Sequence, residues 1–157
     1  MNTGPYSSQE VQKSIEQRFI PLKSECFWDK RTDLMNRFLV KWTPTLLILD
    51  AEGKEHHRMV GYIPDDDFLA HLELGLGKIA FNEDRYAEAG DHFQAVVNRH
   101  PKAGAVPEAV FLNGVAGYRR LQDPKPLRLA YESLSERYPQ SEWARRSKPY
   151  AQIPLDE

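Results

Sequence analysis

The sequence predicts an α/β region followed by an all-α region, and three observations support this fold class. The apolar run TLLILD, Thr45 to Asp50, is typical of a strand that is buried on both sides. The turn AEGKE, with Gly53 at its tip, separates this run from a second short strand over His57 to Gly61, so the pair predicts a hairpin. From Pro64 onward apolar residues recur at helical spacing, which predicts a series of helices.

The residues before the hairpin predict a helix, a short strand and a second helix. Ser7 and Glu10 have the spacing of a capping box at the start of the first helix. The segment FIPLKS, Phe19 to Ser24, is interpreted as a strand. The stretch CFWDKRTDLMNRFLV contains the second helix, with Leu34, Phe38 and Leu39 on its apolar face, and either Asp29 or Thr32 is its expected N-cap.

The helices after the hairpin are marked by apolar stripes and by proline. Pro64 suits a first helical position, and the acidic run Asp65–Asp67 complements the positive end of that helix. One later helix ends at RHP, and the next begins at Pro107. A further helix ends at RYP, and the last one begins after a cap at Ser141. We therefore divide the chain into residues 1–81, an α/β domain, residues 82–150, a helical region, and residues 151–157, an irregular tail.

Composition and charge exclude several classes of function. The net charge is −2 with 28% charged residues, so no basic face is expected and nucleic acid is not an expected partner. No apolar run has membrane-spanning length, and the N-terminus lacks the regions of a signal peptide, so we expect a cytoplasmic protein with no membrane partner. The single cysteine, Cys26, excludes an internal disulfide and a cysteine-based zinc site.

Few residues have the pattern of a catalytic or metal site. Cys26 is interpreted as a small buried residue, and a reactive thiol is the alternative, with Lys23 and Lys30 as the neighbouring positive charges. His56 and His57 are adjacent on a predicted strand and therefore point to opposite faces, which prevents them from binding one metal ion together. No catalytic triad order, phosphate-binding loop or dinucleotide turn is present. The sequence predicts no catalytic residue, no metal and no cofactor.

The segment GKIAFNEDRYAEAGDHFQAVVNRHP resembles one tetratricopeptide repeat. Gly77, Ala89, Phe93 and Pro101 fall at the spacing of that repeat. Small residues at positions 77 and 89 let two helices approach, Phe93 fills the space between them, and Pro101 ends the second helix.

A second, degenerate copy of the repeat runs from Pro107 to Pro139, with Gly114 and Tyr131 in matching roles. One interpretation is a docking surface for a peptide or a partner helix. The other is that the two copies only brace each other and the α/β region, because an isolated array needs about three repeats.

The segment from Phe19 to Phe81 resembles the second half of a thioredoxin fold. The resemblance is carried by FIPLKSE, WTPTLLILDAEGKE, HHRMVGY and PDDDFLAHL. It implies a parallel strand plus a hairpin with flanking helices, and a cis bond between Thr43 and Pro44. It also implies that Thr43 presents its backbone to an extended peptide and that Trp42 flanks the groove. The whole arrangement resembles bacterial thioredoxin-like proteins with a helical C-terminal extension.

The first part of that fold, with its Cys-x-x-Cys motif, has no counterpart in the sequence. Three explanations stay open. Met1 is an internal methionine of a longer protein, or the short form is genuine and non-catalytic, or a partner chain completes the sheet by strand addition.

These observations lead to two hypotheses of function. The first is a non-catalytic binding or scaffold protein that docks an extended peptide or a partner helix. The second is a truncated thiol-disulfide oxidoreductase whose Cys-x-x-Cys motif lies upstream of Met1. Open sheet edges make homo-oligomers an expected form.

Overall fold

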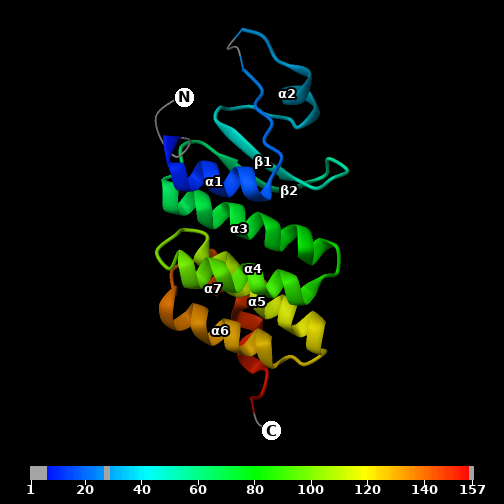
Figure 1. The fold of residues 1–157 in the computed structure, drawn as a ribbon. Helices are drawn as coiled ribbons and strands as arrows, with labels where there is room; N and C mark the ends of the chain where they lie inside the picture. The colour runs from blue at the N-terminus through cyan, green and yellow to red at the C-terminus, as the bar shows by residue number, and fades with distance from the viewer. Residues whose placement is uncertain (1–6, 27–28, 156–157) are drawn as a thin grey trace. The chain divides into compact units, whose positions relative to one another are not determined.

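The computed structural model describes residues 7–26 and 29–155 (Figure 1). The chain separates into two compact units, Met1–Leu69 and Ala70–Glu157. The division falls inside one helix, α3 (Asp65–Asn82), whereas the sequence places the boundary after Phe81. The fold class is confirmed: a small antiparallel sheet comes first and a series of helices follows.

Two helices precede the sheet, and the capping prediction is wrong for the first and confirmed for the second. Helix α1 (Gln9–Arg18) has Ser8 as its N-cap, so the capping box predicted from Ser7 does not begin this helix. Helix α2 (Asp33–Arg37) is capped by Thr32, whose side-chain oxygen accepts a hydrogen bond from the Met35 N–H at 3.2 Å. The cap satisfies one of the N–H groups that have no partner within the helix.

The strand predicted over Phe19 to Ser24 is wrong. These residues form no strand, and the side chains of Ile20 and Leu22 are 99% and 78% exposed. Within residues 7–26 and 29–155 the sheet has two strands, both from the hairpin, and Phe19 to Ser24 pair with neither of them. Pro21 also lacks the N–H that a central strand would need.

The predicted hairpin is confirmed. Strands β1 (Thr45–Leu49) and β2 (Glu55–Val60) are antiparallel, and a bulge interrupts the register beside Ile48 and Leu49. Gly53 occupies the turn with φ of 79°, a conformation that favours glycine. Successive residues alternate between two faces, and the buried face carries Ile48, His57 and Met59.

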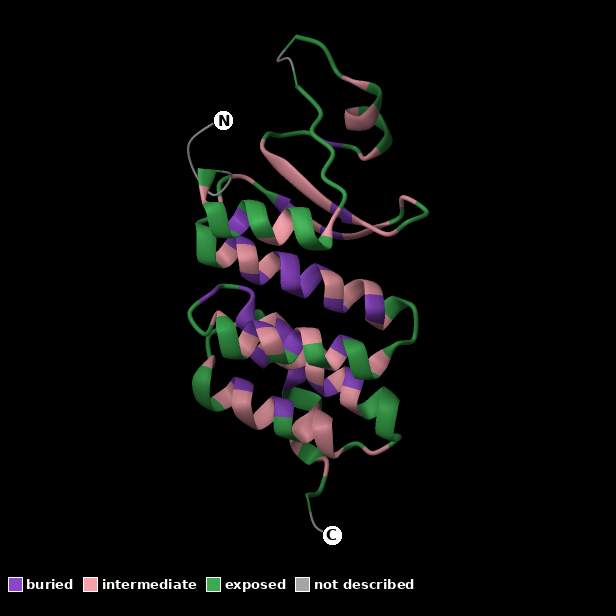
Figure 2. Cartoon of the chain, viewed as in Figure 1, coloured by how far each residue is buried: buried purple, intermediate pink, exposed green. Residues whose placement is uncertain are grey.

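Four helices and a 3-10 helix follow α3. They are α4 (Tyr86–Arg99), α5 (Val106–Leu121), α6 (Lys125–Arg137), α7 (Glu142–Ser147) and η2 (Lys148–Gln152). Helix α5 packs against α4, α6 and α7. In the helical unit the buried residues, purple in Figure 2, lie mainly on α3, α4 and α5. The fully buried side chains here include Leu74, Phe93, Val96, Val106 and Leu134.

The ends of these helices follow the sequence signals. Pro107 lies in the first turn of α5, and the Ser141 hydroxyl oxygen accepts a hydrogen bond from the Ala144 N–H at 3.1 Å. The 3-10 helix η2 extends to Gln152, into the segment predicted to be irregular, and the ring of Tyr150 stacks on Phe111 with centroids 5.9 Å apart. In the part of the chain that the structure describes, no helix has both the length and the hydropathy to cross a membrane.

Candidate functional site

The predicted peptide-binding residues lie at the base of the hairpin, where β1 begins and β2 ends. The Gly61 N–H donates to the Pro44 carbonyl oxygen at 2.8 Å, and the Thr45 hydroxyl donates to the Trp42 carbonyl oxygen at 2.6 Å. The peptide bond between Thr43 and Pro44 is cis. Trp42 and Thr43 are exposed, and Pro44 is half-buried. Backbone contacts therefore fix this segment while its first two residues face solvent.

Four large apolar side chains are exposed at this end of the hairpin, and we call them the base patch. They are Leu39, Trp42, Val60 and Tyr62, with exposed fractions of 68%, 69%, 55% and 72%. Trp42 was expected from the sequence, whereas Leu39 was expected on the buried face of the second helix. That expectation is wrong because α2 ends at Arg37 and Leu39 has a positive φ of 52°, outside the helix.

Arg58 connects the end of α2 to the sheet next to the base patch. Its guanidinium donates to the Phe38 carbonyl oxygen at 2.6 Å and to both carboxylate oxygens of Glu55 at 2.7 Å. The hydrogen bonds from Arg58 lower the pKa of Glu55, and those to Glu55 raise the pKa of Arg58. The hydrogen bond from Arg58 to the Phe38 carbonyl thus holds the backbone directly before Leu39 against β2, and the ion pair with Glu55 orients the guanidinium.

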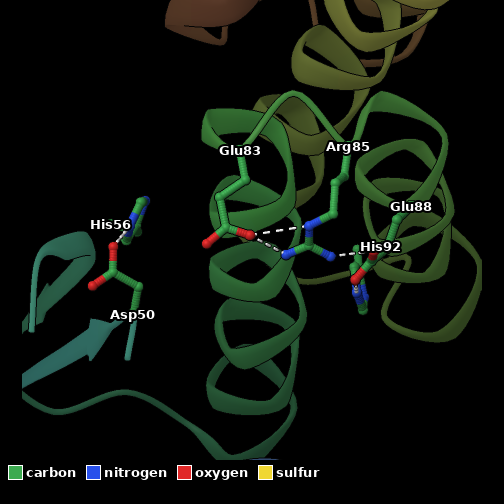
Figure 3. A network of polar contacts seen from close by, with 6 residues as sticks. All are labelled: Asp50, His56, Glu83, Arg85, Glu88 and His92. Atoms are coloured by element: carbon green, nitrogen blue, oxygen red, sulfur yellow. Dashed lines mark hydrogen bonds and ion pairs between the residues drawn. The ribbon is translucent and has the colours of Figure 1, made fainter. Parts of the chain in front are cut away.

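At the opposite end of the hairpin, Asp50 and His56 form a close pair (Figure 3). The Asp50 Oδ2 and His56 Nε2 atoms are 2.7 Å apart, and the two side chains are 10% and 2% exposed. Asp50 Oδ1 also accepts from the backbone N–H groups of Lys54 at 2.8 Å and Glu52 at 3.1 Å. The hydrogen bond from His56, followed by that from Lys54, lowers the pKa of Asp50. This pair stabilises the turn.

The bulge explains how His56 reaches Asp50. In the register of the hairpin Ile48 pairs with His57 and Leu49 pairs with Glu55, which makes His56 the extra residue of β2. A bulge redirects the side chain of the residue that it adds. Among residues 7–26 and 29–155, no group of three or more His, Cys, Asp or Glu residues could hold a metal ion.

A second polar network joins α3 to α4 in the helical unit (Figure 3). The Arg85 guanidinium is hydrogen-bonded to the carboxylates of Glu83 and Glu88. The bonds from Arg85 lower the pKa of Glu88, and the reciprocal effect raises the pKa of Arg85. His92 Nδ1 lies 2.7 Å from Oε1 of the buried Glu73. The His92–Glu73 contact was not expected from the sequence, because the two residues are far apart along the chain.

The residues named for repeat packing lie where α3 and α4 approach most closely. A Cβ atom added to Gly77 would lie 2.5 Å from Cε1 of Phe93, closer than atoms can pack, so this crossing requires glycine. Ala89 and Phe93 are fully buried, and Pro101 follows the end of α4. The structure therefore brings Gly77 and Phe93 together.

The next pair of helices repeats this contact. A Cβ atom added to Gly114 would lie 2.6 Å from the Cβ of Ala130, which follows it by sixteen residues, as Phe93 follows Gly77. The sequence named Tyr131 for this role, and the contact is made one residue earlier. Ala130 has a smaller side chain than Phe93 and therefore fills less space between its two helices.

Cys26 is exposed, contrary to the interpretation of a small buried residue. Its sulfur lies 3.8 Å from the Ser24 carbonyl oxygen. Cys26 follows Phe19 to Ser24, the residues that were predicted to form a strand. Because these residues form no strand, the thiol that follows them is exposed.

Comparison with known proteins bears on the first unit. Residues 6–76 match the family model of a thioredoxin-like domain. The matched segment includes Trp42, Thr43 and Pro44 and the four residues of the base patch. It ends one residue before Gly77 and therefore does not test the resemblance of the helices to tetratricopeptide repeats. Neither a curated protein nor a solved structure matches the chain.

Proposed function

We propose that the chain is a non-catalytic binding protein that docks an extended peptide at the base patch of its thioredoxin-like domain. The observation that carries this proposal is that four large apolar side chains near the hairpin base, Leu39, Trp42, Val60 and Tyr62, are each more than half exposed, and that Thr43 is exposed as well. Large apolar patches on a protein surface mark interaction sites, and aromatic residues are enriched there.

The peptide would use backbone and side-chain contacts together. An extended peptide gains affinity from main-chain hydrogen bonds and specificity from pockets for alternate side chains. Thr43 supplies the exposed backbone, and Trp42 and Tyr62 supply the apolar surface on either side of the hairpin base. Arg58 and the Gly61–Pro44 hydrogen bond hold this surface in place, which limits the entropy lost on binding.

The helical region has a supporting role in this proposal. Its two glycine-mediated helix contacts, at Gly77 and Gly114, resemble those of tetratricopeptide repeats and would give a rigid surface for a partner helix. The protein would act in the cytoplasm, where a single exposed thiol stays reduced.

A second candidate, favoured by the thioredoxin-like match, is part of a thiol-disulfide oxidoreductase whose cysteines lie upstream of Met1. Sequencing of the DNA upstream of Met1 tests this candidate, and an in-frame Cys-x-x-Cys motif would support it. An insulin-reduction assay of the present chain should show no turnover, because Cys26 has no second cysteine to resolve a mixed disulfide.

The peptide proposal is tested by selection of phage-displayed peptides on the immobilised protein, followed by titration of one synthetic selected peptide. Trp42→Ala should weaken binding of that peptide by about tenfold or more, the loss expected of a central aromatic contact. Equal affinity of the wild type and Trp42→Ala would contradict the proposal.

The matched control is Leu129→Ala. Leu129 is 55% exposed, close to the exposure of Val60, but lies on α6 in the helical unit. This variant should bind the same peptide as tightly as the wild type. A loss equal to that of Trp42→Ala would place the peptide on the helical region instead.

A further inference from the structure

We infer that the outer edge of β1 pairs in antiparallel orientation with β1 of a second copy of this chain, so that two hairpins form one four-stranded sheet. This dimer goes beyond the proposed peptide docking, which needs only one chain. It rests on the hydrogen-bond pattern of β1, on the difference between the two edges of the sheet, and on the charges that flank β1.

The hydrogen-bond pattern shows which backbone groups of β1 are available. The Gly61 N–H bonds to the Pro44 carbonyl, so Pro44 and Gly61 form a hydrogen-bonded pair. Such pairs alternate along an antiparallel ladder, and Leu46 and Ile48 therefore direct their backbone groups to β2. Thr45, Leu47 and Leu49 direct theirs to the outer edge. The bulge adds its extra residue to β2, so the alternation along β1 is unbroken.

No strand of the described chain lies on this outer edge. The sheet contains β1 and β2, and none of the backbone hydrogen bonds outside the helices and the hairpin ladder involves Thr45, Leu47 or Leu49. Three residues at a spacing of two thus present N–H and C=O groups in a row, which is the template that strand addition uses.

The two edges of the sheet differ in how well they are protected from pairing. Strand β2, Glu55–Val60, carries the Glu55–Arg58 ion pair and two histidines, and charged side chains discourage edge-to-edge contact. Strand β1 reads Thr-Leu-Leu-Ile-Leu, with no charge, proline or glycine. Of the two edges, β1 is therefore the one that pairs.

The flanking charges select a second copy as the occupant and antiparallel as the orientation. An exposed lysine, Lys41, precedes β1, and an exposed glutamate, Glu52, follows it. Antiparallel pairing centred on Leu47 places the end of β1 that is preceded by Lys41 in one chain at the end that is followed by Glu52 in the other, twice by symmetry. Parallel pairing would place like charges side by side. Lys54 lies beyond the turn apex, at the start of the return to β2, and therefore away from this edge.

Sedimentation velocity of the full chain over a range of concentrations, without added peptide, tests the dimer. The wild type should dimerise reversibly at or below about 1 mM, as expected for a small interface. Lys41→Glu and Glu52→Lys should each weaken the dimer by about tenfold, because each reversal makes two attractive pairs repulsive. The double variant Lys41→Glu/Glu52→Lys should restore wild-type dimerisation.

These charge reversals are on exposed residues and leave the fold intact, so their outcome does not depend on stability. A wild type that stays monomeric at 1 mM would overturn the dimer, and so would a double variant no better than the single ones. An isotope-edited nuclear Overhauser effect between Leu47 of the two chains is a direct readout of the antiparallel register, and its absence from the dimer would overturn this pairing.

Two proline variants identify the edge. Leu47→Pro removes an outward N–H of β1 and should abolish the dimer, whereas Val60→Pro removes the corresponding outward N–H of β2 and should not. Equal loss in both variants, with circular dichroism unchanged, would overturn the assignment to β1. The proposed function is tested separately: a monomer that still binds the selected peptide contradicts only the dimer, and a dimer that binds no peptide contradicts only the docking.

Discussion

The two compact units differ in how completely they bury their own apolar residues. In the helical unit the largest side chains, such as Phe93 and Leu134, are fully buried. In the α/β unit Ile20, Trp42 and Tyr62 are exposed by more than two thirds. The helical unit therefore buries these side chains in its core, and the α/β unit leaves large apolar side chains in solvent.

The difference has a physical cause in the backbone. A helix satisfies its interior N–H and C=O groups within one segment, so helices can pack on any matching apolar face. A strand satisfies its N–H and C=O groups only through neighbouring strands, and the two-stranded sheet of the described residues leaves two edges unpaired. Binding activity is thus expected in the unit whose sheet is short, and the helical unit is expected to dominate stability.

The largest expected effect is the loss of the helical core. Phe93→Ala should lower the free energy of unfolding by about 3–5 kcal/mol, measured by urea denaturation, because it leaves a cavity between α3 and α4. The control Leu129→Ala should change it by less than about 0.5 kcal/mol. A loss of less than about 1 kcal/mol for Phe93→Ala would show that the helical core is not tightly packed.

The next effect concerns the close approach of α3 and α4. Gly77→Ala should destabilise the protein by about 1–3 kcal/mol, since its Cβ would overlap the Phe93 ring. Gly90→Ala is the matched control on α4, where the nearest atom would be 3.3 Å away. It should be neutral or stabilising by up to about 1 kcal/mol, because alanine favours the helix. If both variants behave alike in thermal denaturation, the tight contact at Gly77 is not present in solution.

A smaller effect is expected at the turn of the hairpin. The pKa of Asp50 is lowered in the folded protein, so its contribution to stability is present above the unfolded pKa and is lost as pH falls through the folded value. Asp50→Asn should lower Tm by a few degrees at pH 7. The difference from the wild type should shrink below about pH 4.

The control for Asp50 is Glu52→Gln, which removes the neighbouring exposed carboxylate. Its Tm should follow the wild type across the same pH range. A deficit of Asp50→Asn that stays constant down to pH 2 would show that the charge of Asp50 does not stabilise the turn.

The smallest effect on stability is expected at the base patch. Trp42 is 69% exposed, so Trp42→Ala should change the free energy of unfolding by less than about 0.5 kcal/mol, even though it is expected to weaken peptide binding by about tenfold or more. Urea denaturation measures the first quantity and peptide titration the second. A large loss of stability would mean that Trp42 is a core residue and would weaken the case for docking.

Local signals accounted for much of the fold. The threonine cap of α2, the proline in the first turn of α5 and the serine cap of α7 were all predicted, because each depends on a few neighbouring residues. The hairpin was predicted for the same reason, from two apolar runs and Gly53. The strand over Phe19 to Ser24 failed because a strand exists only if a second one lies beside it.

The candidate site was only partly predictable. Trp42, Thr43 and Pro44 came from a resemblance to thioredoxins, and the structure places them at the base of the hairpin. Their neighbours Val60 and Tyr62 are close only through the antiparallel pairing of β1 and β2. The Asp50–His56 pair depends on a bulge, and no residue type in this sequence marks its position.

The sequence by itself determined the hairpin, the run of helices that follows it and the caps of α2 and α7, because these depend on the conformational preferences of residues that are close along the chain. Only the tertiary structure decided which strands pair, which backbone groups of β1 stay open, and which apolar side chains remain in solvent. Those outcomes depend on whether another strand or another apolar side chain lies beside the residue in the folded chain, and the order of residues in the sequence does not contain that information.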